Sequence, residues 1–252
     1  MFTKLKVLAI GILLLSSVCE ASRIAPPPGD PAFRCSKKEL TAQECQEDRD
    51  YARETNCITE QELKEVIAYN GCPACDRRGN YKGWCLQGCF IRGTKILVWD
   101  TVEATEEWVA VEDVIYQSTR FKVASIRKDA TLRDLNYEYL PIRLTTEGPE
   151  LEPLVIITTN KRTIGVTNTH GVALANGHLV AAKDINVGDQ LLTTDSSEQV
   201  LMIERPLTDD LVFNLSVESD DPKSHLILAE GGLVVGDQFL QSSTYLNSTL
   251  LR

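Results

Sequence analysis

Short apolar runs separated by turn residues dominate the chain after residue 89. Many are rich in β-branched side chains, and two of them, Val172 to Leu174 and His178 to Ala181, flank Asn176-Gly177. Both residues of an Asn-Gly pair tolerate a positive φ, so this segment favours a tight hairpin. Roughly ten runs over about 150 residues, without helical periodicity, predict a compact all-β domain. The expected strands span residues 94–99, 154–159, 162–167, 172–174, 178–181, 190–194, 199–204, 211–217, 225–228 and 233–235.

The region before residue 89 has a helical pattern. Thr59 and Glu62 form a capping box, and apolar residues then recur at helical spacing, which predicts a helix that begins at this point. An earlier helix is expected to begin near Ser36 or Thr41. The Gly- and Cys-rich stretch from Cys72 to Gly88 is expected to be a loop.

The first residues resemble a secretory signal peptide. Lys4 and Lys6 precede an apolar run from Val7 to Leu15, and small residues follow up to Ala21. This run is shorter than the about 20 apolar residues that a membrane-spanning helix needs. No later stretch resembles a membrane span, so we expect a secreted protein without a stable span, in which a Pro-rich leader at 22–33 follows the signal peptide.

The charge pattern argues against nucleic acid as a partner. The formal net charge is −10, and the sequence has no cluster of Lys and Arg that could bind a phosphate backbone.

All eight cysteines lie at or before position 89. Cys19 belongs to the signal peptide, and Cys89 is left over from an even set of six that is typical of a small secreted, disulfide-bonded module. Six cysteines allow 15 pairings, and the sequence does not choose among them. The set is Cys35, Cys45, Cys57, Cys72, Cys75 and Cys85.

Two of these cysteines have the C-x-x-C spacing of redox and zinc sites. No thioredoxin-like βαβ pattern surrounds Cys72-Pro73-Ala74-Cys75, and a secretory context favours structural disulfides. We therefore expect no metal and no cofactor. We also expect Cys85 to bond within the helical module and Cys89 to lie in the mouth of the β domain.

Several motifs after residue 88 occur in an order that resembles a Hint domain, the module shared by inteins and the C-terminal part of Hedgehog proteins. Gly88-Cys89-Phe90 resembles the opening of that domain, and Thr167 to His170 resembles its T-x-x-H motif. The resemblance continues to residue 237 and implies the Hint fold. The further blocks are Gly93 to Ile96, Asn176-Gly177, Ala181-Ala182, Val187 to Leu191, Phe213 to Val217, His225 and Gly232 to Val235.

The resemblance implies autocatalytic cleavage of the chain between Gly88 and Cys89. In that reaction the Cys89 thiol attacks the Gly88 carbonyl and turns the amide into a thioester. His170 would give a proton to the leaving amine, and Thr167 would place its hydroxyl on the same amide. Water or a small thiol or alcohol would then accept the acyl group. No pattern identifies a binding partner for the released module.

Four positions depart from the family pattern. Inteins end in Asn, which is commonly preceded by His and followed by Cys, Ser or Thr, but Gly236, Asp237 and Gln238 stand at the corresponding positions. Gln238 cannot accept an acyl group, so we expect no splicing. Asn214 stands where many inteins have Asp. A degenerate Hint fold that acts as an inert structural or binding domain is therefore the alternative function.

The expected organisation is a signal peptide at 1–21, the leader at 22–33, a cysteine-rich helical module at 34–88, a Hint domain at 89–237 and a tail at 238–252. That tail is too short for the sterol-binding extension of Hedgehog proteins. We expect His225 to support the closing strands and His178 to be solvated.

Overall fold

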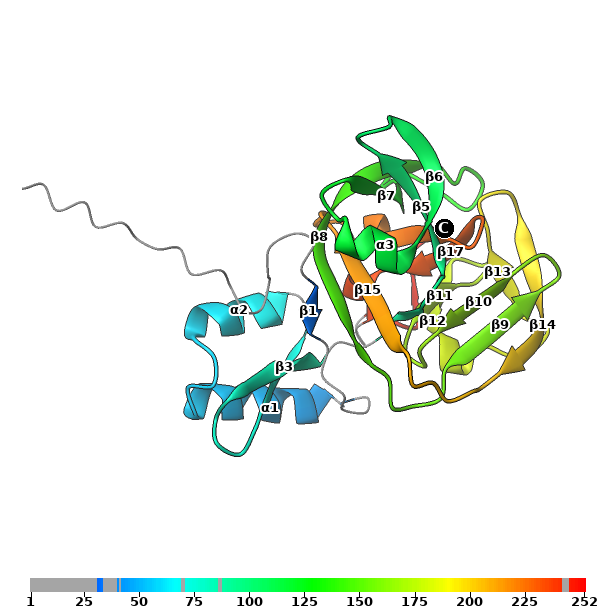
Figure 1. The fold of residues 1–252 in the computed structure, drawn as a ribbon. Helices are drawn as coiled ribbons and strands as arrows, with labels where there is room; N and C mark the ends of the chain where they lie inside the picture. The colour runs from blue at the N-terminus through cyan, green and yellow to red at the C-terminus, as the bar shows by residue number, and fades with distance from the viewer. Residues whose placement is uncertain (1–30, 34–39, 41, 69–70, 86–87, 242–244) are drawn as a thin grey trace, which may run out of the picture.

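The computed structural model describes residues 31–33, 40, 42–68, 71–85, 88–241 and 245–252. A small α-helical module lies on one side of a larger β domain, and the C-terminal residues lie on the β domain away from that module (Figure 1). The mostly β fold with a few N-terminal helices confirms the expected fold class. The signal peptide, residues 22–30 of the Pro-rich leader and Cys35 lie outside the described residues. No helix among these residues is long and apolar enough to cross a membrane.

The module contains two helices and a hairpin. Helix α1 spans Ala42–Glu54 and helix α2 spans Glu60–Ala68. The Thr59 amide donates to the Glu62 carboxylate at 2.7 Å, and the Glu62 amide donates to the Thr59 hydroxyl at 3.1 Å. These reciprocal bonds satisfy two N-terminal donors of α2 and confirm the capping box.

The prediction of a loop over 72–88 was wrong for most of its length. Strands β2, Cys72–Cys75, and β3, Tyr81–Cys85, form an antiparallel hairpin. Asp76 makes the turn, because its carboxylate accepts from the amides of Arg78 and Asn80 at 2.8 and 3.0 Å.

Two disulfide bonds link the hairpin to α1 and to the loop between α1 and α2. Cys45 bonds to Cys72, and Cys57 bonds to Cys75. The C-x-x-C cysteines therefore have different partners, so the motif is not a redox pair in this state. The side chain of Cys85 lies outside the described residues.

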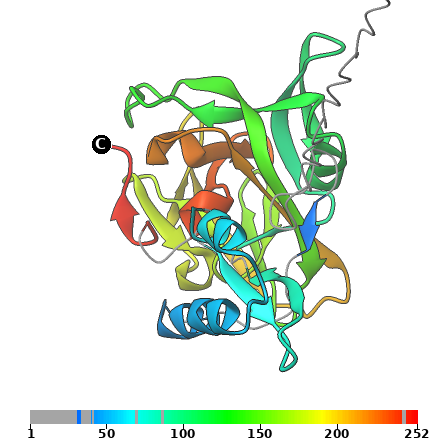
Figure 2. The same cartoon turned by 90° about the vertical axis from the view of Figure 1, so that its left-hand side faces the viewer.

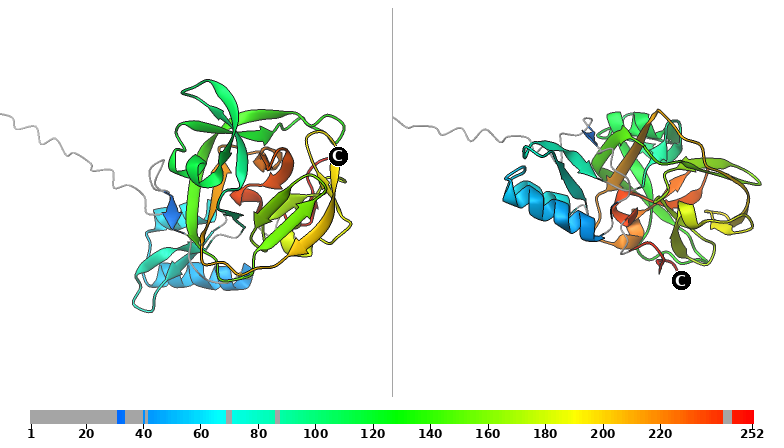
Figure 3. Two further views of the ribbon diagram at one scale, coloured as in Figure 1. Left: turned by 45° about the vertical axis from the view of Figure 1, so that its right-hand side comes forward. Right: turned by 90° about the horizontal axis from the view of Figure 1, so that it is seen from below.

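The module meets the β domain through a short parallel strand pair. Strand β1, Ala32–Phe33, pairs with the long strand β8, Tyr137–Pro149. Leu144 of β8 packs into the same buried cluster as Leu63 and Val66 of α2. Figures 2 and 3 show the helices beside the β domain from three further directions.

The β domain contains more strands than the sequence predicts. All ten expected strands are present within a few residues, but the sequence did not predict the strands β4, β6, β7, β8 and β18 or the short helix α3, Val111–Tyr116. The remaining strands are β4 (Phe90–Ile91), β5 (Lys95–Asp100), β6 (Thr105–Ala110), β7 (Phe121–Ile126), β9 (Val155–Thr159), β10 (Thr163–Val166), β11 (Gly171–Ala173), β12 (His178–Ala181), β13 (Gln190–Leu192), β14 (Ser197–Glu204), β15 (Leu211–Val217), β16 (Leu226–Ala229), β17 (Leu233–Gly236) and β18 (Ser248–Thr249).

Fourteen strands form one continuous path of neighbours, and β6 pairs with β5 off this path. The order β13-β14-β9-β10-β4-β15-β8-β7-β5-β16-β17-β11-β12-β18 places the two-residue strand β4 in the interior of the sheet. Phe90 and Phe213 are fully buried in the main core, together with aliphatic side chains from the surrounding strands. The first residues of the β domain are therefore inside it rather than at its edge.

A buried ion pair ties the closing strands together. Nδ1 of His225 lies 2.7 Å from the Asp237 carboxylate, and Nε2 lies 3.1 Å from the Ser219 carbonyl oxygen. Burial alone would lower the pKa of His225, but the charge and hydrogen bond of Asp237 and the Ser219 carbonyl outweigh it, so the pKa is raised. His225 supports the closing strands as expected, and His178 is exposed.

We expect His225→Ala to lower the free energy of unfolding by about 3–5 kcal/mol, because it leaves the Asp237 carboxylate buried without its charge partner. The stabilisation by the pair is complete below the unfolded pKa of histidine and is lost as the pH rises through the raised folded pKa. Urea unfolding at mildly acidic pH measures the effect. The control His178→Ala changes an exposed histidine and should stay within about 0.5 kcal/mol of wild type. Equal losses in both variants would contradict the prediction.

Candidate functional site

The register of β4 determines which side chains meet at Cys89. Phe90 pairs with Val166 of β10 on one side and with Phe213 of β15 on the other. Both pairings are antiparallel, so the residue before Phe90 lies opposite the residues that follow Val166 and Phe213. These residues are Thr167 and Asn214.

Thr167 binds both the backbone N–H and the backbone C=O of Cys89. The Cys89 amide donates to the Thr167 hydroxyl at 2.7 Å, and the Thr167 amide donates to the Cys89 carbonyl at 2.9 Å. The hydroxyl of Thr167 thus lies on the amide between Gly88 and Cys89, the contact that the T-x-x-H motif implies.

Asn214 binds the other polar atom of the same peptide bond. Its Nδ2 donates to the Gly88 carbonyl oxygen. Its Oδ1 accepts from the Leu215 amide at 2.9 Å, which requires the NH₂ group to face Gly88. In the sequence, Asn214 stood out only as a departure from the family pattern. Its position within the Phe213–Val217 block was the available signal.

Gly88 has a backbone conformation and surroundings that favour glycine. Its φ is +70°, and a Cβ atom there would overlap the side chain of Gln241. A larger residue at this position would therefore be strained and would also displace Gln241.

His170 lies in the core, three residues after Thr167. Its amide donates to the Thr167 carbonyl at 3.1 Å, and its ring lies 4.3 Å from the Phe90 ring. The side chain is fully buried, and this desolvation lowers the pKa of His170 to about 3. His170 is therefore a neutral imidazole near neutral pH.

Cys89 is not in a disulfide bond and is fully buried. It packs against Leu154 and Val212, so the expectation that it lies in the mouth of the domain was wrong. The reason is the interior position of β4, which carries the residue before it into the core.

The C-terminal end of the region of resemblance, at Asp237 and Gln238, differs in its chemistry from the Gly88–Cys89 peptide bond. Both oxygens of the Asp237 carboxylate accept backbone hydrogen bonds, from Val217 at 2.8 Å and from Phe239 at 2.9 Å. Gln238 is buried, and its Oε1 lies 3.3 Å from the Thr146 hydroxyl. None of these contacts involves the Gly88–Cys89 peptide.

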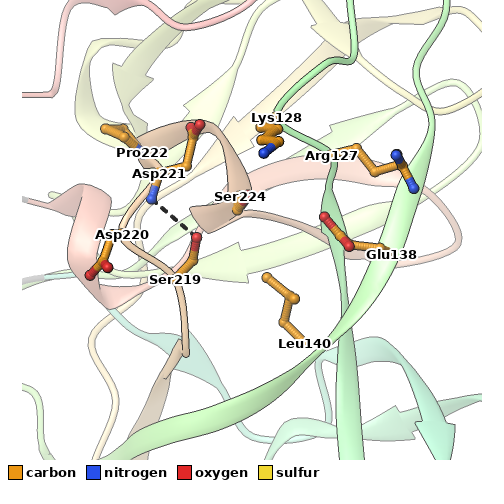
Figure 4. A pocket seen from close by; sticks show the side chains of 9 residues that line it. All are labelled: Arg127, Lys128, Glu138, Leu140, Ser219, Asp220, Asp221, Pro222 and Ser224. Carbon is orange, nitrogen blue, oxygen red and sulfur yellow. Dashed lines mark hydrogen bonds between the residues drawn. The ribbon is translucent and has the colours of Figure 1, made fainter.

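A separate cavity of about 580 Å³ opens on the β domain (Figure 4). Basic and acidic side chains, including Arg127, Lys128 and Glu138, line it together with Ser219 to Pro222. None of the Cys89 site residues lines this cavity. In the part of the chain that the structure describes, no group of three His, Cys, Asp or Glu side chains could hold a metal ion.

Comparisons with known proteins agree with the fold. No family model matches the sequence, and no curated protein matches it. Among solved structures, an intein from a hyperthermophile superposes with a TM-score of 0.50 at 16% identity, covering 60% of this chain and 100% of that one. The Pab PolII intein (TM-score 0.49, 18% identity, 59% and 100% covered) and the DnaB intein from Synechocystis sp. PCC 6803 (0.47, 16%, 60% and 99%) are further matches. The β domain of this chain has the Hint fold of inteins.

Proposed function

We propose that the Hint domain cleaves its own chain between Gly88 and Cys89. The observation that carries the proposal is that side chains bind both polar atoms of one buried peptide bond. Asn214 and Thr167 bind its carbonyl and its amide, and the thiol of Cys89 belongs to the same bond. Asn214 of β15 and Thr167, which directly follows β10, thus contact the two atoms that an N-to-S acyl shift must polarise and release.

The reaction begins with attack of the Cys89 sulfur on the Gly88 carbonyl carbon. A C–S bond forms, the electron pair of the C=O bond moves to oxygen, and the C–N bond then breaks as the oxyanion collapses. The products are a Gly88 thioester on Cys89 and the free amino group of Cys89. The NH₂ group of Asn214 stabilises the oxyanion, because it already faces the carbonyl oxygen.

His170 carries the proton between the two groups. It is neutral at the start because burial lowers its pKa, so it accepts the proton of the Cys89 thiol before it gives a proton to the leaving amine. An imidazolium in a fully buried site is a strong acid, which favours the second transfer. Thr167 keeps the amide nitrogen in place during both steps.

The thioester is then transferred to water or to a small thiol or alcohol. Gly88 and Cys89 are both buried, which favours a small acceptor. Splicing does not follow, because Gln238 has no nucleophilic side chain. The Asp237 carboxylate is also held by His225 and by two backbone amides, which opposes its attack on the main chain.

A secreted location fits the disulfide bonds of the module, which persist in oxidising compartments. The resemblance of residues 1–21 to a signal peptide supports the same proposal. The cleaved module would leave the β domain only after the β1–β8 pairing separates.

The alternative function, an inert Hint fold, is favoured by one observation. Cys89 is fully buried among apolar side chains, and an apolar environment disfavours a thiolate. The two functions differ in whether the chain breaks, which a mass measurement decides.

We expect the purified protein to break between Gly88 and Cys89 when a small thiol is added at neutral pH. Intact-mass analysis under denaturing conditions separates the fragments even if they stay associated. Cys89→Ala should abolish the reaction, and Thr167→Ala and His170→Ala should each slow it by about 10²-fold or more. A wild-type chain that stays whole through prolonged thiol treatment would instead support the inert fold.

We expect Asn214→Ala to slow thioester formation by about 10²–10³-fold, because it removes a donor to the oxyanion. Asn214→Asp should slow the reaction at least as much, since a carboxylate would repel the developing negative charge. The thiol-dependent rate of chain cleavage gives both values. Circular dichroism checks that each variant is folded. A rate for Asn214→Ala within twofold of wild type would remove the oxyanion role.

We expect His170 to make the fold sensitive to acid. Its pKa is about 3 when folded and about 6.5 when unfolded. At pH values between these two, the unfolded chain therefore binds one more proton than the folded chain. Stability should therefore fall with decreasing pH, by about 1.4 kcal/mol per pH unit from this group. The Cys89→Ala chain with and without His170→Gln, unfolded in urea at several pH values, tests this. Identical pH slopes would contradict it.

A further inference from the structure

Gln241 connects His170 to the end of the chain. It is the last residue of the 3₁₀ helix η3, Gln238–Gln241, and is 2% exposed. Its Oε1 accepts from the Gly171 amide at 2.7 Å, and its Nε2 donates to the Gly236 carbonyl at 3.0 Å. The same Nε2 lies 3.3 Å from Nδ1 of His170. No motif of the sequence analysis includes this residue, and it follows the region of resemblance.

The backbone contacts define the orientation of the Gln241 amide. An amide N–H can only donate and a carbonyl can only accept, so the atom facing Gly171 must be oxygen and the atom facing Gly236 must be nitrogen. The NH₂ group has a second hydrogen, and Nδ1 of His170 is the acceptor within reach. Nδ1 therefore carries a lone pair, and the proton of the neutral ring is on Nε2.

The opposite tautomer would be unfavourable in this arrangement. An N–H at Nδ1 would face the NH₂ group of Gln241, and two donors would then oppose each other in a buried site. Nε2 of His170 has no hydrogen-bond partner among the described residues, so Gln241 makes the one side-chain contact that distinguishes the two ring nitrogens. The side chain of Gln241 also lies against Gly88, so Nδ1 and the acyl residue share this neighbour.

We propose that Gln241 is a positioning residue that fixes His170 as the Nε2-protonated tautomer and so leaves Nδ1 as the proton acceptor next to the scissile bond. The inference rests on the proposed cleavage for its functional meaning. The thiol proton of Cys89 replaces the Gln241 N–H at Nδ1, and the amide of Gln241 keeps its bond to Gly236. When Nδ1 gives the proton to the Cys89 nitrogen, the contact with Gln241 forms again. The segment after residue 237 thus completes the site.

The tautomer can be measured without cleavage. In the full Cys89→Ala chain labelled with ¹⁵N-histidine, two-bond ¹H–¹⁵N correlation spectra should show His170 with a protonated Nε2 and an unprotonated Nδ1. Gln241→Glu keeps the acceptor for Gly171 but replaces the donor with a carboxylate, so Nδ1 should become protonated. Gln241→Met removes both groups, and His170 should then populate both tautomers. In the chain that retains Cys89, Gln241→Glu should slow thiol-induced cleavage by about 10-fold or more.

A matched control comes from the same 3₁₀ helix. Gln238 is also buried, but its Oε1 lies 3.3 Å from the Thr146 hydroxyl, so Gln238→Met should leave the tautomer of His170 unchanged. A protonated Nδ1 in the Cys89→Ala chain would overturn the proposal, and so would a pure Nε2-protonated tautomer in both Gln241 variants. If Gln241→Glu does not fold, the tautomer of His170 in Gln241→Met decides whether the proposal holds. A wild-type chain that does not cleave but shows the expected tautomer would refute the proposed function and retain the role of Gln241.

Discussion

The site depends on the placement of one peptide bond inside a β-sheet, with neighbouring strands on both sides. A buried peptide must have its N–H and C=O groups satisfied, because an unpaired polar group in the core costs about 1–3 kcal/mol. In a regular sheet the neighbouring backbones would provide these bonds. Between Gly88 and Cys89 they come from the side chains of Thr167 and Asn214 instead. The same contacts that make burial possible also bind the two atoms that the reaction must activate.

This arrangement explains why a two-residue strand lies in the interior of the sheet. A strand as short as β4 gives few backbone hydrogen bonds, but Phe90 is fully buried and packs in the main core. The burial of Phe90 fixes the register against β10 and β15, and that register determines what lies opposite Cys89. Gly88 lies two residues before β4, has a positive φ and lies against the side chain of Gln241.

The sequence predicted the residues whose identities belong to a local motif. Gly88, Cys89, Thr167 and His170 lie in short segments with a recognisable order, and most strands after residue 150 have clear apolar runs. Strand β8 was missed because Pro141 interrupts it and because its first half is only partly buried. Asn214 lay within a recognised block, but the sequence did not indicate its role, and Gln241 lay outside every motif. Their roles arise from the register of β15 and from the return of the C-terminal segment to His170, and neither is encoded in local spacing.

The two buried histidines, His225 and His170, differ in charge because their surroundings differ. His225 lies at the C-terminal junction, and His170 belongs to the site at the Gly88–Cys89 junction. His225 faces a carboxylate and a carbonyl, so both ring nitrogens donate and its pKa is raised. As an imidazolium it holds the Asp237 carboxylate, and this ion pair fixes the C-terminal junction in a form without a reactive amide. His170 faces an amide donor on one side and has no described partner on the other, so burial lowers its pKa and it stays neutral. A neutral ring can accept a proton, which is what attack by a thiol requires. The same domain therefore has a C-terminal junction that is held by an ion pair and an N-terminal junction beside a neutral histidine, and this asymmetry is the physical basis on which we propose cleavage at Gly88–Cys89 without splicing.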